Sequence, residues 1–133
     1  MHAAIRLGRL APCVPVSDIG RAVGFYSSVF GMEKTFENGE PVGFVILKRD
    51  GAELHLTLVK DHVGKTQNVM HLMVEAGVEE VYRRCEAAAA ARIIKRLRDA
   101  PWGLRTFVVA DPDGNRIDVG QQIQPVSARH EGA

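Results

Sequence analysis

The segment Pro101-Trp102-Gly103-Leu104-Arg105-Thr106-Phe107-Val108-Val109-Ala110-Asp111-Pro112-Asp113-Gly114-Asn115-Arg116-Ile117-Asp118-Val119-Gly120-Gln121 predicts two strands joined by a tight turn. Pro112 suits the first inner position of that turn, and Asp113-Gly114 supplies the left-handed geometry that hairpins need. After the turn, apolar residues alternate with polar ones, so Asp118 lies on the face opposite the apolar side chains. A carboxylate on the inner face of a curved sheet is a candidate ligand group.

The same order of elements is predicted twice along the chain. The first half is expected to form the strand Leu10–Val16, a helix from the Ser17-Asp18 N-cap to Gly31, and the strands Glu33–Glu37, Val42–Arg49 and Ala52–Val59. The second half is expected to form the strand Val69–Val74, a helix with Val78, Val81, Tyr82 and Cys85 on one face, the strand Arg92–Arg98, and the two strands above. Asn38-Gly39 and Asp50-Gly51 are predicted as hairpin turns. The fold class is therefore α+β, with two tandem βαβββ units forming a curved mixed sheet around an open groove, helices outside.

Length and composition indicate one ordinary globular domain. The 133 residues divide into a first unit (8–59), a linker (60–67), a second unit (68–123) and a flexible tail (124–133). A formal charge of +1 gives no reason to expect nucleic acid or a membrane as partner. No long apolar run is present, so the cytoplasm is the default location. Cys13 and Cys85 are expected to be small buried residues without a disulfide.

Two motifs resemble the vicinal oxygen chelate superfamily, which includes glyoxalase I, fosfomycin-resistance enzymes, extradiol dioxygenases and bleomycin-resistance proteins. The segment from Ser17 to Gly31 is similar to that family's first helix, and Asp111-Pro112-Asp113-Gly114-Asn115 is similar to its most recognisable turn. Pro101-Trp102-Gly103 and the segment Asp50–Asp61 resemble the bleomycin-resistance branch in particular. The resemblance covers roughly residues 8–123 and implies the glyoxalase/bleomycin-resistance fold.

In the metal-dependent members, four inner strands each provide one His or Glu ligand. Carried over one at a time, these positions fall on Ala11, on His55 (or on Glu53 if the strand slips by two residues), on Val69 and on Asp118. Two of the four are apolar, and zinc needs three or four ligand groups, so no metal and no other cofactor is expected. The alternative is one divalent ion held by His55 or Glu53, by His71 two residues after Val69, and by Asp118.

The bleomycin-resistance likeness implies an antibiotic-resistance-like protein that binds a small, partly apolar molecule. Two protomers would pair as a homodimer and enclose the ligand in grooves lined by Phe36, Phe44, Glu53, His55, His71, Trp102 and Asp118. Those relatives are acidic and trap a cationic drug, whereas this chain is near neutral, so bleomycin is not the expected ligand. The alternative function is a metal-dependent lyase, isomerase or dioxygenase with a reduced ligand set. Whether the chain is an enzyme stays open, and catalytic residues are unknown.

Several candidates also have simpler interpretations. Glu53 pairs with His55 or with a neighbouring Arg, and Asp118 is expected to accept a hydrogen bond from His55 across the groove. Trp102 either borders the groove or covers the edge of the core. The basic run Arg92, Lys95, Arg96 and Arg98 is interpreted as a solvated edge strand rather than as an anion site. The sequence does not identify the ligand.

Overall fold

The computed structural model describes residues 4–7, 9–62 and 68–123, so the predicted tail (124–133) and residues 63–67 of the predicted linker lie outside the described residues. The first unit contains β1 (Cys13–Val16), α1 (Ile19–Phe30), β2 (Glu33–Asn38), β3 (Phe44–Arg49) and β4 (Ala52–Leu58), followed by a short 3-10 helix (Lys60–His62). The second contains β5 (Val69–Met73), α2 (Val78–Ala87), β6 (Arg92–Asp99), β7 (Leu104–Ala110) and β8 (Arg116–Gln122). The predicted α+β class and the doubled βαβββ order are confirmed.

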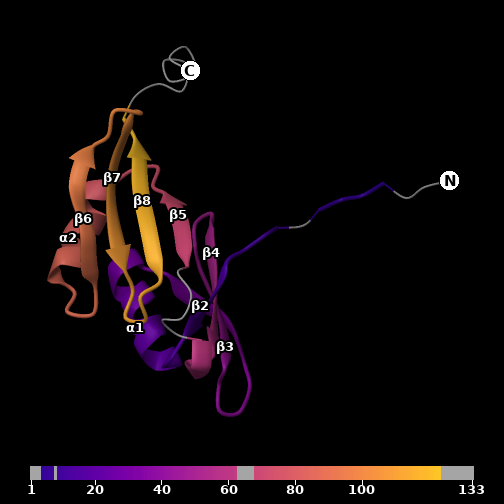
Figure 1. The fold of residues 1–133 in the computed structure, drawn as a ribbon. Coiled ribbons are helices and arrows are strands. Elements are labelled where there is room, and N and C mark those ends of the chain that lie inside the picture. Colours follow the sequence, from indigo (N-terminus) through magenta and orange to yellow (C-terminus); the bar gives the residue numbers. More distant parts are fainter. Residues whose placement is uncertain (1–3, 8, 63–67, 124–133) are drawn as a thin grey trace.

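Each unit forms a four-stranded mixed sheet (Figure 1). Sheet A has the order β1-β4-β3-β2, and sheet B has the order β5-β8-β7-β6. In both, the first strand runs parallel to the last one, and the remaining neighbours are antiparallel. The register places Cys13 beside His55 in sheet A and His71 beside Asp118 in sheet B. The two pairs therefore occupy equivalent positions in the two units.

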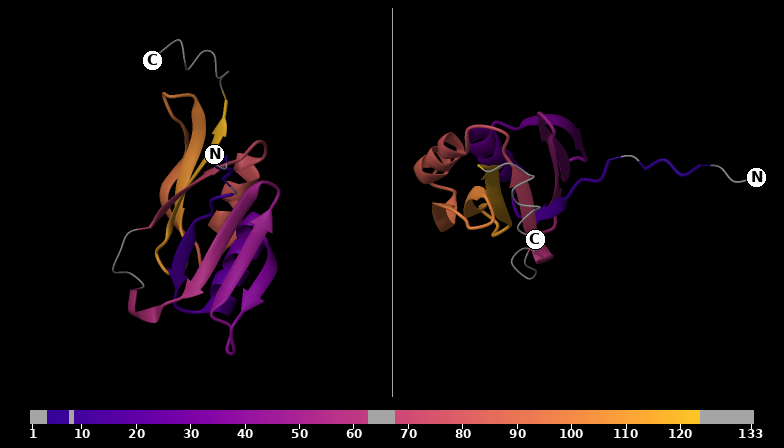
Figure 2. Two further views of the ribbon diagram at one scale, coloured as in Figure 1. Left: turned by 90° about the vertical axis from the view of Figure 1, so that its right-hand side faces the viewer. Right: turned by 90° about the horizontal axis from the view of Figure 1, so that it is seen from above.

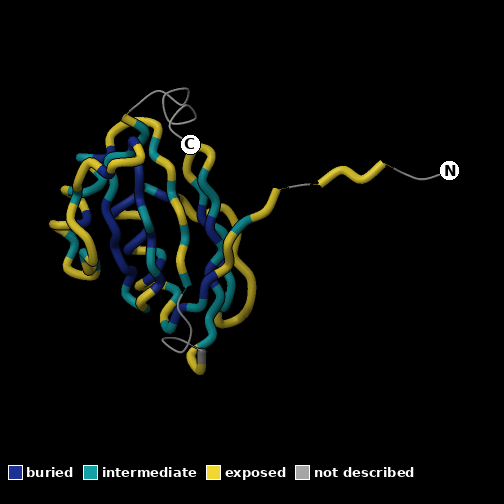
Figure 3. Tube along the Cα trace, turned by 45° about the horizontal axis from the view of Figure 1, so that its top comes forward, coloured by how far each residue is buried: buried dark blue, intermediate teal, exposed yellow. Residues whose placement is uncertain are grey.

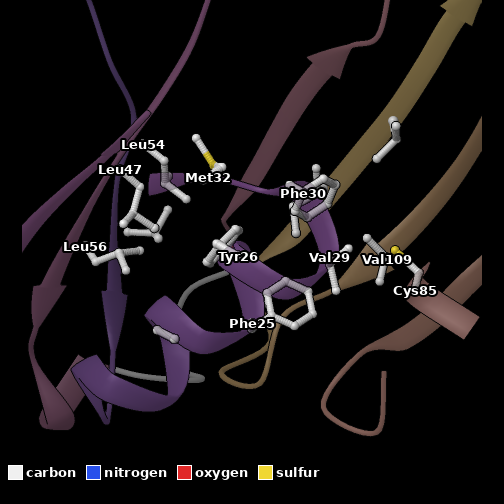
Figure 4. Close-up of a cluster of buried hydrophobic side chains, with 14 of the residues drawn as sticks. Phe25, Tyr26, Val29, Phe30, Met32, Leu47, Leu54, Leu56, Cys85 and Val109 are labelled. Atoms are coloured by element: carbon white, nitrogen blue, oxygen red, sulfur yellow. The ribbon is translucent and has the colours of Figure 1, made fainter. Parts of the chain in front are cut away.

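The helix α1 begins and ends where the sequence predicts. The Asp18 side chain caps its first turn by accepting from the backbone N–H of Arg21 at 2.9 Å. Gly31 ends it with a φ of 70°, a left-handed conformation that favours glycine. Figure 4 shows α1 between side chains of sheet A, such as Leu56, and side chains of the second unit, such as Val109. Both units thus contribute to one hydrophobic core.

Alternation along the strands separates a helix-covered face from an open face in each sheet. Leu54 and Leu56 of β4 are buried, whereas Glu53, His55 and Thr57, which alternate with them, remain partly accessible. Figure 3 shows buried and more accessible positions along the strands. In β5, Met70 and Leu72 pack on the core, as predicted, while Val69, His71 and Met73 are exposed on the other side. The open faces are where the candidate site residues lie.

A buried polar network joins the two units at the turn between β7 and β8. The Asp111 carboxylate accepts from the Tyr26 hydroxyl at 2.7 Å, from Asn115 Nδ2 at 2.9 Å, and from two backbone N–H groups of the turn. Asn115 Nδ2 also donates to the Pro15 carbonyl at 3.0 Å. Burial first, and the neighbouring Asp111 second, raise the pKa of Tyr26 well above its usual value. The turn therefore ties the second unit to α1 and to β1.

Next to this network, the turn also contacts the start of α1. The Asp113 carboxylate accepts from the backbone N–H and the hydroxyl of Ser17, at 3.1 and 2.6 Å, and Arg21 completes the contact at 3.1 Å. The motif that was predicted only as a hairpin turn thus also fixes how the two units meet.

Three sequence predictions about local structure are wrong. The first strand begins at Cys13 rather than at Leu10, because Pro12 has no N–H to donate to a sheet. Asn38-Gly39 is not a two-residue turn, since the connection runs through residues 39–43 and is closed by Gly43 N donating to the Asn38 carbonyl at 3.0 Å. Cys13 is exposed rather than buried. Cys85 is buried as predicted, both cysteines are free, and Asp50-Gly51 does form a two-residue turn.

The described residues before β1 (4–7 and 9–12) extend away from the body of the molecule, as Figures 1 and 2 show from different directions. Its apolar residues Ile5, Leu7 and Leu10 are 87%, 91% and 100% exposed. These apolar side chains make almost no contact with the rest of the described chain. Among the described residues, no helix is long and apolar enough to cross a membrane.

Candidate functional site

The predicted site residues fall into two sets on the two open faces. Sheet A holds Phe36, Phe44, Glu53 and His55; sheet B, with the loop between β6 and β7, holds His71, Trp102 and Asp118. Each set is brought together within its own sheet. Members of the sheet B set line two pockets, His71 the one and Trp102 and Asp118 the other. The four residues of the sheet A set line neither of these two pockets.

The sheet A set is centred on the Glu53 carboxylate, whose side chain is only 10% exposed. His55 Nε2 donates to it at 2.7 Å, Arg9 Nε lies 2.7 Å away and Lys48 Nζ 3.5 Å away. Glu53 therefore contacts both of the partners that the sequence offered as alternatives, His55 and an Arg. The Phe44 ring stands edge-on to His55, with 5.5 Å between the ring centroids, and Phe36 is edge-on to Phe44 at 6.2 Å.

We expect Glu53 to titrate near pH 2. The hydrogen bond from His55 above all, and then the Arg9 contact, hold the pKa of Glu53 at about 2 against partial burial, which raises it. Because the folded-state pKa is depressed, the stabilisation is present above the unfolded value of 4.5 and is lost as the pH falls through about 2. The side-chain carboxyl ¹³C resonance measures this midpoint directly. His55→Gln should raise it and the matched His71→Gln should leave it unchanged; a midpoint near 4.5 in the unaltered protein contradicts the assignment.

The sheet B set is centred on an ion pair between neighbouring residues of one strand. Arg116 Nε donates to Asp118 Oδ1 at 2.9 Å, and both side chains are 25% exposed. The expected hydrogen bond from His55 to Asp118 is wrong, because His55 is bound to Glu53 instead. Residues two apart in a strand share a face, so Arg116 is the nearest donor that the pattern offers.

Trp102 borders a shallow pocket of about 100 Å³ on the open face of sheet B. The lining residues are Lys95, Arg96, Arg98, Trp102, Thr106, Phe107, Val108, Arg116 and Asp118. Trp102 is 54% exposed, and the Arg98 guanidinium carbon lies 5.4 Å from its ring centroid. Trp102 therefore lines this pocket, and its role in a ligand groove remains a prediction.

A larger pocket of about 470 Å³ lies between the segment before β1 and strand β5. It is lined by Leu10, Ala11, Pro12, Val69, Met70 and His71. Ala11 and Val69 are the two positions at which the family resemblance places metal ligands, and both face this pocket with apolar side chains. His71 is the one titratable side chain among these lining residues.

The residues present do not fit a divalent metal ion. Within the described part of the chain, no group of three or more His, Cys, Asp or Glu side chains is arranged to hold one. Ala11 and Val69 have no ligand atoms, and zinc needs three or four donors. Asp118 is paired with Arg116, and Glu53 with Arg9 and Lys48, so cations already occupy the carboxylates that a metal would need.

Comparison with known proteins identifies the family and agrees with the fold. The model of the glyoxalase/bleomycin resistance protein/dioxygenase superfamily matches residues 6–119. The chain belongs to this superfamily. It is similar to the bleomycin resistance protein of Geobacillus stearothermophilus, with 28% identity over 130 residues, which cover 85% of this chain and 96% of the relative.

Two solved structures share the fold described above. TioX from Micromonospora sp. ML1 matches with a TM-score of 0.73 and 25% identity, covering 86% of this chain and 99% of TioX. The bleomycin-binding protein of Streptomyces verticillus, solved with copper(II)-bleomycin, matches with a TM-score of 0.68 and 18% identity, covering 87% and 97%. The second likeness is one of fold alone.

Sequence reasoning missed the roles of two residues, Arg116 and Tyr26. Arg116 was not a candidate, although its position two residues before Asp118 was the available signal. Tyr26 was assigned only to the apolar face of a helix, yet its hydroxyl is a buried donor to Asp111. A buried Tyr hydroxyl needs a partner, but nothing in the sequence says which one.

Proposed function

We propose that this superfamily member is a metal-free binding protein for a small molecule and that it acts as a homodimer. The observation that supports this most is the division of the candidate residues between two open faces. Each face presents aromatic and titratable side chains, and among the described residues of a single chain the pocket beside Trp102 does not include Phe44. A second copy is the simplest means of closing sheet A of one protomer over sheet B of its partner.

The names of the relatives favour binding over catalysis. The Geobacillus stearothermophilus relative is called a bleomycin resistance protein, and the Streptomyces verticillus protein is a bleomycin-binding protein. We extend to this chain the binding of a small molecule, but not the identity of the drug. The cytoplasmic location expected from the sequence remains a prediction.

The exposed segment before β1 supports the dimer and offers its test. Ile5, Leu7 and Leu10 are almost wholly exposed in the single chain, and a specific interface of more than about 1,200 Å² would cover them. We expect the double variant Leu7→Ser/Leu10→Ser to weaken dimerisation by at least about tenfold, since each substitution removes roughly 1.5 kcal/mol or more of apolar burial. Sedimentation velocity across micromolar concentrations measures the change.

Arg6→Ser is the matched control, because it alters the same segment without removing an apolar side chain, and it should leave the dimer intact. An unaltered protein that sediments as a monomer at micromolar concentration overturns the dimeric proposal. A dimer that is equally stable in the double variant excludes this segment from the interface.

A further inference from the structure

The strongest unexplained feature of the molecule is a concentration of positive charge on sheet B. Four cationic side chains line the small pocket beside Trp102, and a single carboxylate, Asp118, opposes them. The whole chain carries a net charge of only +1, so this excess is local. A patch of one sign in a recess attracts ligands of the opposite sign.

Irregular pairing of β6 produces this concentration. Lys95 and Arg98 are three residues apart, and regular alternation would place them on opposite faces of the sheet. The register shifts between them, so that Lys95 pairs with Val108 and Arg98 pairs with Thr106. Val108 and Thr106 share one face of β7, and both cations therefore lie over the same pocket.

The cations of this pocket are not neutralised as those of sheet A are. In sheet A, one carboxylate, Glu53, is in contact with Arg9, Lys48 and His55. Among the described residues, the side chains of Lys95, Arg96 and Arg98 form no ion pair, and Arg98 contacts the Trp102 ring instead.

Asp99, the acidic residue next to Arg98, is already engaged by another cation. It accepts from Arg105 at 2.7 and 3.2 Å, and this hydrogen bonding lowers the pKa of Asp99. Arg105 in turn also contacts Glu79 of α2. The nearest carboxylate in the sequence therefore does not balance the charge of the pocket.

We propose that this pocket binds the anionic group of the ligand, a carboxylate, sulfonate or phosphate, while Trp102 stacks on an adjoining planar ring. The inference rests on the proposed small-molecule function and names the chemical class of the ligand. A volume of about 100 Å³ suits an anionic head group rather than a whole ligand, which extends along the open face. Guanidinium groups match planar anions with two parallel hydrogen bonds, and the exposed ring gives the ligand an apolar contact. A cationic drug is the wrong partner for this charge.

The test compares three probes that share one ring and differ in charge: 2-naphthoate, its neutral amide and the cationic aminomethyl analogue. Trp102 is the single tryptophan of the chain, so its indole N–H resonance reports on this pocket alone. We expect 2-naphthoate to shift that resonance and to bind at least about tenfold more tightly than the amide, with the cation weakest. Added salt should weaken the anion most.

Two charge-reversal variants distinguish ligand binding by this pocket from attraction to the overall charge of the protein. Arg96→Glu should weaken 2-naphthoate binding at least about tenfold. Arg83→Glu makes the same change of net charge on exposed α2, which covers the other face of sheet B, and should have no effect. Equal affinity for naphthoate and its amide overturns the proposal, as does equal weakening by both reversals. Single-stranded oligonucleotides provide a further check. If they displace 2-naphthoate and their affinity rises with their length, the surface is a general polyanion site and the proposal is overturned.

The outcomes distinguish failure of the anion site from failure of the proposed function. The pocket belongs to one chain, so a monomer that discriminates naphthoate from its amide refutes the dimer and keeps the anion site. A dimer that binds all three probes equally keeps the small-molecule function and refutes the anion site.

Discussion

Replacing Asp111 with Ala is expected to destabilise the protein by about 3–5 kcal/mol, the largest effect of any single substitution considered. The carboxylate is buried and accepts hydrogen bonds from Tyr26, from Asn115 and from two backbone N–H groups. Its removal leaves the Tyr26 hydroxyl and the two backbone N–H groups without this acceptor, whereas Asn115 Nδ2 keeps its bond to the Pro15 carbonyl. Chemical denaturation followed by far-UV circular dichroism measures the loss. Because ordinary domains are stable by about 5–15 kcal/mol, the variant is expected to fold, with a strongly lowered midpoint.

Two further variants make the result specific. Tyr26→Phe removes one donor and keeps the ring in the core, so it should cost about 1–3 kcal/mol. Glu75→Ala removes an exposed acid and should change stability by less than about 0.5 kcal/mol. If Asp111→Ala costs no more than Glu75→Ala, the network does not hold the two units together.

The second large effect concerns the ion pair of Arg116 and Asp118, at which two substitutions are expected to change the affinity for 2-naphthoate in opposite directions. Asp118→Asn removes the single carboxylate that lines the basic pocket, and should tighten 2-naphthoate binding about three- to tenfold. Arg116→Gln removes a cation and leaves Asp118 unpaired beside the ligand, so it should weaken binding about tenfold or more. Isothermal titration calorimetry measures both affinities.

Both residues are partly exposed, and such ion pairs contribute about 1 kcal/mol or less, so both variants should fold. Weaker binding in Asp118→Asn would mean that the carboxylate itself contacts the ligand. That outcome favours direct contact between the ligand and Asp118, one of the groove-lining residues expected from the sequence, and argues against an anionic ligand.

The sequence predicted the fold well because its signals are local. The Asp18 cap, the Gly31 stop and the alternation around Leu54 and Leu56 each depend on a few neighbouring residues. The first unit departs from prediction mainly at Pro12 and around the Asn38–Gly43 connection, where a residue without an N–H interrupts the pattern.

The site was predicted less completely because its partners are set by register rather than by residue type. Asp118 was correctly placed on an open face, but its partner Arg116 was not named. The basic run of β6 was interpreted as a solvated edge strand rather than as an anion site, and regular alternation would indeed spread its charges over both faces. Irregular pairing turns Lys95 and Arg98 to one side, and bulges of this kind leave no clear mark in the sequence.

The central claim is that one ligand is held between sheet A of one protomer and sheet B of its partner, without metal. The most direct measurement is an NMR titration of the dimer with 2-naphthoate in the presence of EDTA, following the Trp102 indole and the His55 ring together. His55 lies on sheet A and Trp102 beside sheet B, so a ligand held between the two protomers contacts both residues. Both signals should therefore shift with one midpoint, and the chelator should leave that midpoint unchanged. A shift of Trp102 alone, or shifts that EDTA abolishes and zinc restores, would contradict it.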